Sequence, residues 1–300
     1  MSCPSKAEPD YCNLVLANPD ISGIGVRVAV YVQVGLNVLA STLLQSNLQL
    51  TRDAARSSYV LSLSLILASI AQWRIGGMGL FDALVGVQLA TLMTVFMLFN
   101  IRYINSLGLS INISSTLFLA LYTYWGFQTW TFPACPSNSL TQFVIFGKSV
   151  SATNPGLRIF ALVVFGFVGL ITIFAVVLLL AWAAQVWLHG GEVKARNVRV
   201  RNNVQRERYG IDTGAGKSRI TSLLPLLIMI YLVVSTEQLV ARNKLSNLDE
   251  WSYGQTLAVV MLLSQLVEMG LWVWRERRSS REMAWRGKSG TKGLGLPLVQ

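Results

Sequence analysis

Four charged side chains stand near the ends of otherwise apolar stretches of this sequence. They are Arg27, Asp82, Glu237 and Arg242. Ionisable groups are expensive inside a bilayer, so they usually face a bundle interior, pair with one another or line a solute path. If all four lie at one end of a helix bundle, two main interpretations follow. They form charge pairs that lock helices together, such as Arg27 with Asp82 or Glu237, or they line an outward-facing polar pocket. Snorkelling to the membrane interface is a third reading.

A second set of polar residues falls nearer the middle of apolar stretches. Gln33, Gln88 and Gln265 are amides in such positions, and Asn37 follows Gln33 by one helical turn. Glu268 is expected to share a helical face with Gln265, and it is the most costly residue of this set. Amides within a membrane often serve as inter-helix hydrogen bonds worth about 1 kcal/mol or less. A solute path or ligand cavity explains the same pattern, and the sequence leaves both open.

Patterns for metal, cofactor or nucleotide chemistry are missing. The only histidine is His189, which rules out a histidine-rich metal site, and no His-Glu-x-x-His pattern is present. The segment 214–218 reads Gly-Ala-Gly-Lys-Ser, but Ile211 stands where a phosphate-binding loop needs glycine. We therefore expect no metal and no cofactor. Acid catalysis by carboxylates alone, from Asp82, Glu237 and Glu268, stays open.

The composition predicts an all-α, polytopic transmembrane helix bundle. Hydrophobic residues make up 53% of the chain and charged residues 13%, about half the charged share of a soluble domain, and the mean hydropathy is +0.50. A spanning helix needs roughly 20 apolar residues. Seven stretches suit this role, and we predict spans at 24–44, 58–73, 80–99, 110–130, 159–187, 220–240 and 255–274.

Lysine and arginine set the expected orientation. The apolar stretch 159–187 is followed by a densely basic loop, 190–219, and such loops stay in the cytosol. Seven spans then place the N-terminal tail 1–23 outside and the basic tail 275–300 in the cytosol, on either side of the transmembrane domain 24–274. We expect the tail 275–300 to be disordered. The net charge of +11 follows from this topology, so nucleic-acid binding is not expected.

The three cysteines are Cys3, Cys12 and Cys135. All three fall on the extracytosolic side of this topology, where disulfides persist. We predict a Cys12–Cys135 disulfide that ties the N-terminal tail to the connector after the fourth span. The alternative is that both are free thiols.

Several segments resemble a group of uncharacterised fungal multi-pass membrane proteins. The opening 18–27 reads Asn-Pro-Asp-Ile-Ser-Gly-Ile-Gly-Val-Arg, and later landmarks are Thr236-Glu237 and the segment 251–255, Trp-Ser-Tyr-Gly-Gln. The resemblance covers most of the chain. It implies a seven-helix fold and carries no established activity.

These observations favour a multi-pass protein of the plasma membrane or an endomembrane that senses or transports a small molecule, as receptors and transporters do. Its expected partners are the lipid bilayer, a small-molecule ligand, and a cytosolic protein at the basic loop. A membrane-embedded enzyme, for example a cyclase or isomerase acting on a lipophilic intermediate of secondary metabolism, is the first alternative. A membrane scaffold that recruits its partner through the basic loop is the second.

Overall fold

The fold is mostly helical in a computed structural model that describes residues 15–43, 48–75, 78–99, 109–131, 138, 140–188, 219–243, 245–246, 248 and 250–290. The long helices are α2 (Ile24–Leu43), α3 (Leu48–Ile75), α4 (Leu80–Phe99), α6 (Leu109–Trp130), α8 (Pro155–Leu188), α10 (Arg219–Arg242) and α11 (Tyr253–Gly290). A short helix, α1 (Pro19–Ser22), precedes α2. Each long helix overlaps one predicted span.

Four helical stretches are long and apolar enough to cross a membrane: Pro19–Leu39, Ser58–Ile75, Pro155–Gln185 and Tyr253–Arg275. A shorter apolar stretch, Leu80–Phe96, lies in α4. Helix α11 continues to Gly290, so much of the segment that we expected to be disordered is helical. The helical part, 275–290, contains arginine, glutamate, methionine and alanine residues that are good helix formers, and it has no proline.

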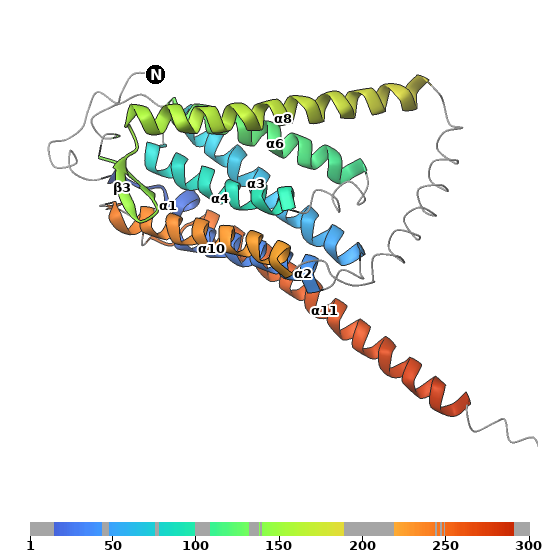
Figure 1. Cartoon of the computed structure of the whole chain (residues 1–300). Helices are drawn as coiled ribbons and strands as arrows, with labels where there is room; N and C mark the ends of the chain where they lie inside the picture. Colours follow the sequence, from blue (N-terminus) through green and yellow to red (C-terminus); the bar gives the residue numbers. More distant parts are fainter. Residues whose placement is uncertain are drawn as a thin grey trace, which may run out of the picture.

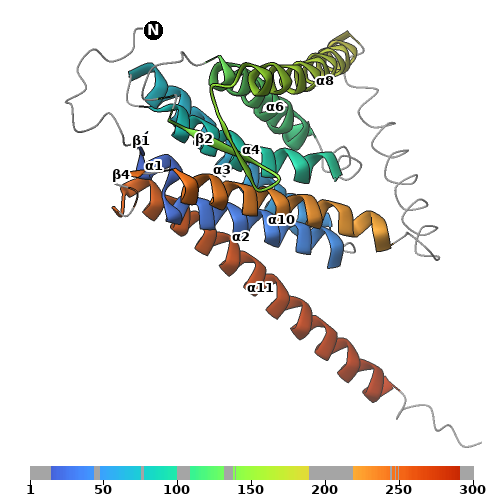
Figure 2. The same ribbon diagram turned by 60° about the vertical axis from the view of Figure 1, so that its left-hand side comes forward.

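The helices pack in three layers (Figures 1 and 2). Helices α6 and α8 lie on one side, α2, α10 and α11 on the other, and α3 and α4 between them, while the end of α11 extends beyond the bundle. Helix α4 is the central helix, with Phe81, Leu84, Leu89 and Met93 almost fully buried. A helix that is apolar on every side is stable only when surrounded by other apolar surface.

Short strands gather at the end of the bundle where α4, α8 and α11 begin. Strand β1 (Val15–Leu16) pairs in parallel with β4 (Leu245–Ser246), and β2 (Gln142–Ile145) forms an antiparallel hairpin with β3 (Lys148–Ser151). The hairpin turn has positive φ at Phe146 (46°) and Gly147 (78°), as a two-residue type I′ turn requires. The span pattern did not predict these strands.

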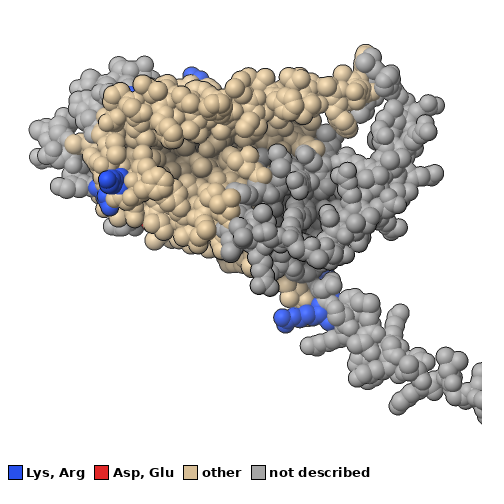
Figure 3. Space-filling view, viewed as in Figure 1, with Lys and Arg blue, Asp and Glu red and all other residues tan. Residues whose placement is uncertain are grey.

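Helix α8 packs mainly on α6 and leaves much of its apolar surface exposed. Ile159, Phe167, Ile173 and Leu180 are all highly exposed on it. On the face seen in Figure 3, the described surface is uncharged except for basic atoms towards the two ends. A broad apolar surface of this kind is unfavourable in water and favourable in lipid.

Candidate functional site

The short helix α1 caps the strand-bearing end of the bundle, and Asp82 holds it there. Asn18 begins α1, and its side chain accepts a hydrogen bond from the Asp20 backbone N–H, as a helix N-cap does. One oxygen of Asp82, Oδ1, accepts from the Asn18 backbone N–H at 3.0 Å and from the Ser22 hydroxyl at 2.7 Å. The Asp82 carboxylate therefore joins the start of α4 to the N-terminal segment.

A second pair of contacts ties this segment to the start of α11. Asp20 Oδ1 accepts from the Gly254 backbone N–H at 2.8 Å, and Gln255 Oε1 accepts from the Gly25 backbone N–H at 2.9 Å. A Cβ at Gly23 would overlap the Pro19 carbonyl and the Gln255 amide. Glycine at this position lets α1, α2 and α11 meet closely.

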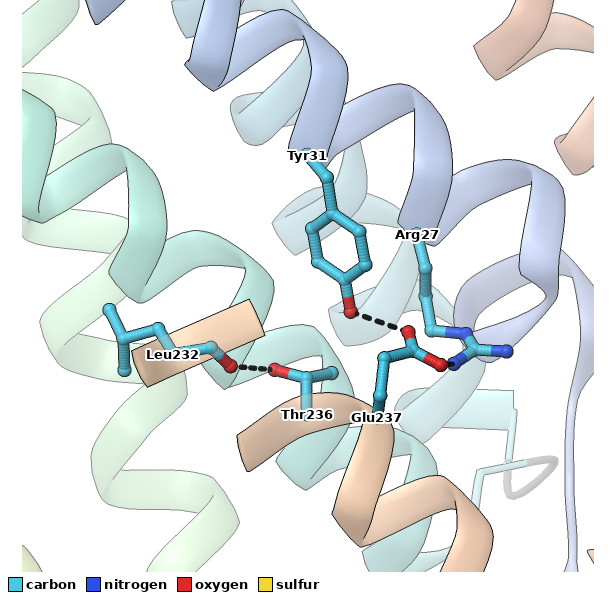
Figure 4. A network of polar contacts seen from close by, with 5 residues as sticks. All are labelled: Arg27, Tyr31, Leu232, Thr236 and Glu237. Carbon is cyan, nitrogen blue, oxygen red and sulfur yellow. Dashed lines mark hydrogen bonds and ion pairs between the residues drawn. The ribbon is translucent and has the colours of Figure 1, made fainter. Parts of the chain in front are cut away.

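Arg27, Tyr31 and Glu237 form a polar cluster between α2 and α10 (Figure 4). Arg27 Nη1 donates to Glu237 Oε2 at 2.5 Å, and the Tyr31 hydroxyl donates to Glu237 Oε1 at 2.9 Å. The Arg27 side chain is 5% exposed and the Glu237 side chain 48% exposed. Charge pairing between helices is therefore the observed arrangement, with Glu237 rather than Asp82 as the partner of Arg27.

Arg242 belongs to a different contact. Its Nη1 donates to Ser149 Oγ at 2.7 Å, on the β2–β3 hairpin. Asn243 bonds both ways with the Gln142 backbone, and Ser235 donates to the Val144 carbonyl. These bonds hold the hairpin against the side of α10 away from Glu237, so Arg242 and Glu237 do not share a site.

The amides of the bundle interior link three helices. Gln265 Nε2 donates to Asn37 Oδ1 at 3.0 Å, and Asn37 Nδ2 donates to Ser58 Oγ. This chain connects α11, α2 and α3, as inter-helix amide bonds do. Gln33 and Gln88 are buried as well.

The structure contradicts the expectation that Glu268 shares a helical face with Gln265. Gln265 is 3% exposed, whereas Glu268 is exposed, so the two do not share an environment. Residues three apart differ by about 60° around a helix, and the seam between α11 and α2 admits only the first of them.

Comparison of the chain with protein-family models, curated proteins and solved structures gives no match. The resemblance to fungal multi-pass proteins stays a prediction. Cys3, Cys12, Cys135, His189 and the loop 190–218 lie outside the described residues. Within the described part of the chain, no three His, Cys, Asp or Glu side chains are placed to hold a metal ion.

Among the residues that the structure describes, some buried polar atoms have no hydrogen-bond partner. They include Arg27 Nε, Gln88 Oε1 and Gln265 Oε1. An unsatisfied buried polar group is unfavourable by roughly 1–3 kcal/mol, so such atoms usually meet a water or a ligand. Arg27 lies near the capped end of the bundle, and Gln88 and Gln265 lie nearer its centre.

Three further site residues were not singled out by their chemistry in the sequence. Ser22, Asn18 and Gln255 bind the capped end together, yet each is an ordinary residue for a turn or helix start. The segment 18–22 reads as a helix entry with Asp20 or Ser22 as the expected cap, whereas the structure places the N-cap at Asn18. The sequence gives no sign that this short helix packs against four others.

Proposed function

We propose that this chain is a seven-span membrane protein of the plasma membrane or an endomembrane, with its N-terminus outside and its C-terminus in the cytosol. It senses or transports a small, uncharged polar molecule through an outward-facing recess beside the β2–β3 hairpin. The seven long helices at the predicted positions support the span count, since each is at least 20 residues long.

The observation that carries the recess is the course of the hairpin along α10. Its base is bonded to Asn243, and its tip contacts Tyr231, where the Phe146 and Tyr231 ring centroids are 5.2 Å apart. Tyr231 lies about three turns, or roughly 16 Å, before the end of α10 at Arg242. The hairpin therefore reaches well into the depth of the helix bundle.

Such a hairpin needs water at that depth. In the two-stranded sheet, side chains of α10 bond the outer edge of β2. The outer edge of β3 has no strand partner among the described residues, and Lys148 is exposed at the tip. Open sheet edges are not found in lipid and occur at membrane depth only within protein or beside water. Helix α8 begins four residues after β3 and exposes Ile159, Phe160 and Val163 in its first turns. Lipid beside α8 and water beside the hairpin together favour a recess that opens outward.

The polar interior favours an uncharged solute. Apart from Arg27 and the Asp82 carboxylate, which binds α1, the buried polar side chains of the described residues are uncharged. They include the amides Gln33, Asn37, Gln88 and Gln265 and hydroxyls such as Ser58. Neutral donors and acceptors replace the hydration of hydroxyl or amide groups, but they compensate an ion poorly. A polyol or a small amide is therefore the solute class that fits.

The first test is the access of water to the hairpin. In a chain whose three native cysteines are replaced by serine, Lys148→Cys is expected to react with a membrane-impermeant maleimide added from the extracytosolic side. Val163→Cys on the lipid-facing surface of α8 is the matched control and is expected to stay unlabelled until detergent is added. Labelling of Lys148→Cys only from the cytosolic side would reverse the orientation, and equal protection of both cysteines would remove the recess.

The second test addresses the solute. Purified protein in proteoliposomes is expected to raise the permeability to at least one polyol or small amide, measured by light scattering after an osmotic step, if it transports. If it senses, the same solute is expected to raise its melting temperature. Gln88→Leu should weaken either response about ten-fold, because an amide hydrogen bond is lost.

Gln128→Leu serves as the control, since Gln128 is a partly exposed glutamine on α6. Its response should equal that of the wild type. The proposed function would be contradicted if no probe raised the permeability or the melting temperature. An unchanged response in Gln88→Leu would contradict it as well.

The enzyme alternative has less support. Acid catalysis by carboxylates needs groups that meet at one substrate. In the structure Asp82 binds α1, Glu237 binds α2, and Glu268 is exposed on α11. The three carboxylates therefore lie in separate environments and do not meet at one site.

A further inference from the structure

The seam between α2 and α10 carries a half-exposed carboxylate on a surface that suits lipid. Glu237 is 48% exposed, while its partner Arg27 is 5% exposed and lies beneath it. Structural pairing of the two charges does not require an open carboxylate. The exposed side of Glu237 is therefore available to a donor from outside the protein.

Apolar residues continue from Glu237 along both helices. From Glu237 towards the start of α10, the same helical face carries Val234, Ile230 and Leu227, and all three are exposed. Val28 and Val32 are exposed on α2, beside Arg27 and Tyr31 in the chain. A polar acceptor at one end of two apolar stripes matches an amphiphile with one small head group and a hydrocarbon body.

The depth of the carboxylate limits the kind of head group. Glu237 lies five residues before Arg242, the last residue of α10, which corresponds to about 7 Å along the helix. This depth falls at the boundary between head groups and acyl chains, roughly 5–10 Å into the membrane. Tyr31, which donates to Glu237, is also a residue typical of this boundary.

The charges at the seam further limit the kind of head group that can bind. Arg27 and Tyr31 donate to the two oxygens of Glu237, and each oxygen keeps a second lone pair for another donor. The buried guanidinium neutralises the carboxylate, so a full cation gains little there. An anionic head group would meet the exposed carboxylate before the buried arginine. A neutral hydroxyl is the donor that fits.

We propose that the α2–α10 seam is a binding site for a sterol-type membrane lipid, whose hydroxyl donates to Glu237 and whose ring system lies along Val28, Val32, Val234 and Ile230. The site rests on the proposed membrane embedding and is independent of the solute recess, which lies on the other side of α10. It also gives a reason for the incomplete burial of an ion pair within a bundle.

The test uses purified protein in phosphatidylcholine vesicles and a cholesterol analogue that carries a diazirine. After illumination, label is expected on the peptides that contain 24–39 and 226–234. Unlabelled cholesterol should compete for this labelling at least about ten-fold better than its 3-O-methyl ether, since the ether lacks the donor hydrogen. This comparison needs no variant protein.

Helix α8 is the internal control, because Val163, Phe167 and Leu170 are at least as exposed as the seam residues and the helix itself contains no acidic residue. Label there should respond alike to cholesterol and its ether. Glu237→Gln should reduce the advantage of cholesterol over its ether at the seam. Val28→Trp with Val234→Trp, which fills the stripes and leaves the ion pair intact, should abolish seam labelling.

Three outcomes would overturn the site. They are label spread evenly over α8 and the seam, equal competition by the ether, and stronger competition by phosphatidylethanolamine, which would assign the carboxylate to an ammonium group. Even labelling of lipid-facing helices would still support membrane embedding. Failure of the sterol site is therefore distinguishable from failure of the proposed topology.

Discussion

Leucine in place of Glu237 is expected to lower the free energy of unfolding by about 2–3 kcal/mol. The change leaves the buried Arg27 guanidinium without its carboxylate, and removal of one partner from a buried ion pair costs about 3–5 kcal/mol. The expected loss of stability is smaller than this because Glu237 is half exposed. Unfolding of the purified protein in mixed micelles, followed by tryptophan fluorescence, measures the loss.

The reciprocal and double variants separate pairing from simple loss of packing. Arg27→Met leaves Glu237 at a half-exposed position where its charge can reach the interface, so a smaller loss is expected. Arg27→Met with Glu237→Leu removes both charges and should recover most of the stability lost in Glu237→Leu. Strictly additive losses would mean that the two side chains are not coupled.

Valine in place of Gly126 is expected to detach α8 from α6, with a loss of about 1–3 kcal/mol or more. A Cβ at Gly126 would overlap the ring of Phe165. That ring cannot move freely, because its centroid lies 5.2 Å from the Tyr122 ring and 6.4 Å from the Phe127 ring. Thermal melting and protease sensitivity of α8 measure the effect.

Two companion variants identify the cause. Phe165→Ala combined with Gly126→Val should restore part of the stability, because the smaller side chain makes room for the new methyl groups. Gly166→Val on α8 is the control, since a Cβ there meets no atom within 4 Å. Equal damage from Gly126→Val and Gly166→Val would show that helix propensity rather than the α6–α8 contact is responsible.

The long helices were predictable because each depends on a local property. Apolar stretches of about 20 residues, broken by glycine-rich or charged connectors, marked all seven positions to within a few residues, apart from the extensions of α3 and α11. The extension of α11 was missed because basic residues after Trp274 suggested a solvated tail. Their backbone preference is nonetheless helical.

The β2–β3 hairpin and α1 were not predictable in the same way. A four-residue strand and a single helical turn have too few residues for a periodic pattern. Both are held by partners far along the chain. The hairpin is anchored to Asn243, and α1 is anchored to Asp82 and Gln255.

Residue types alone determined that Arg27, Asp82 and Glu237 carry charge in apolar surroundings, and that Asn37 and Gln265 offer hydrogen bonds there. These properties are local, and any fold would have to satisfy them. Which groups meet was decided by the tertiary structure. Glu237 takes Arg27 while Asp82 takes α1, and Gln265 turns inward while Glu268 turns outward. Pairing depends on how helices far apart in sequence are rotated and spaced, and that geometry comes from the packing of all of them together.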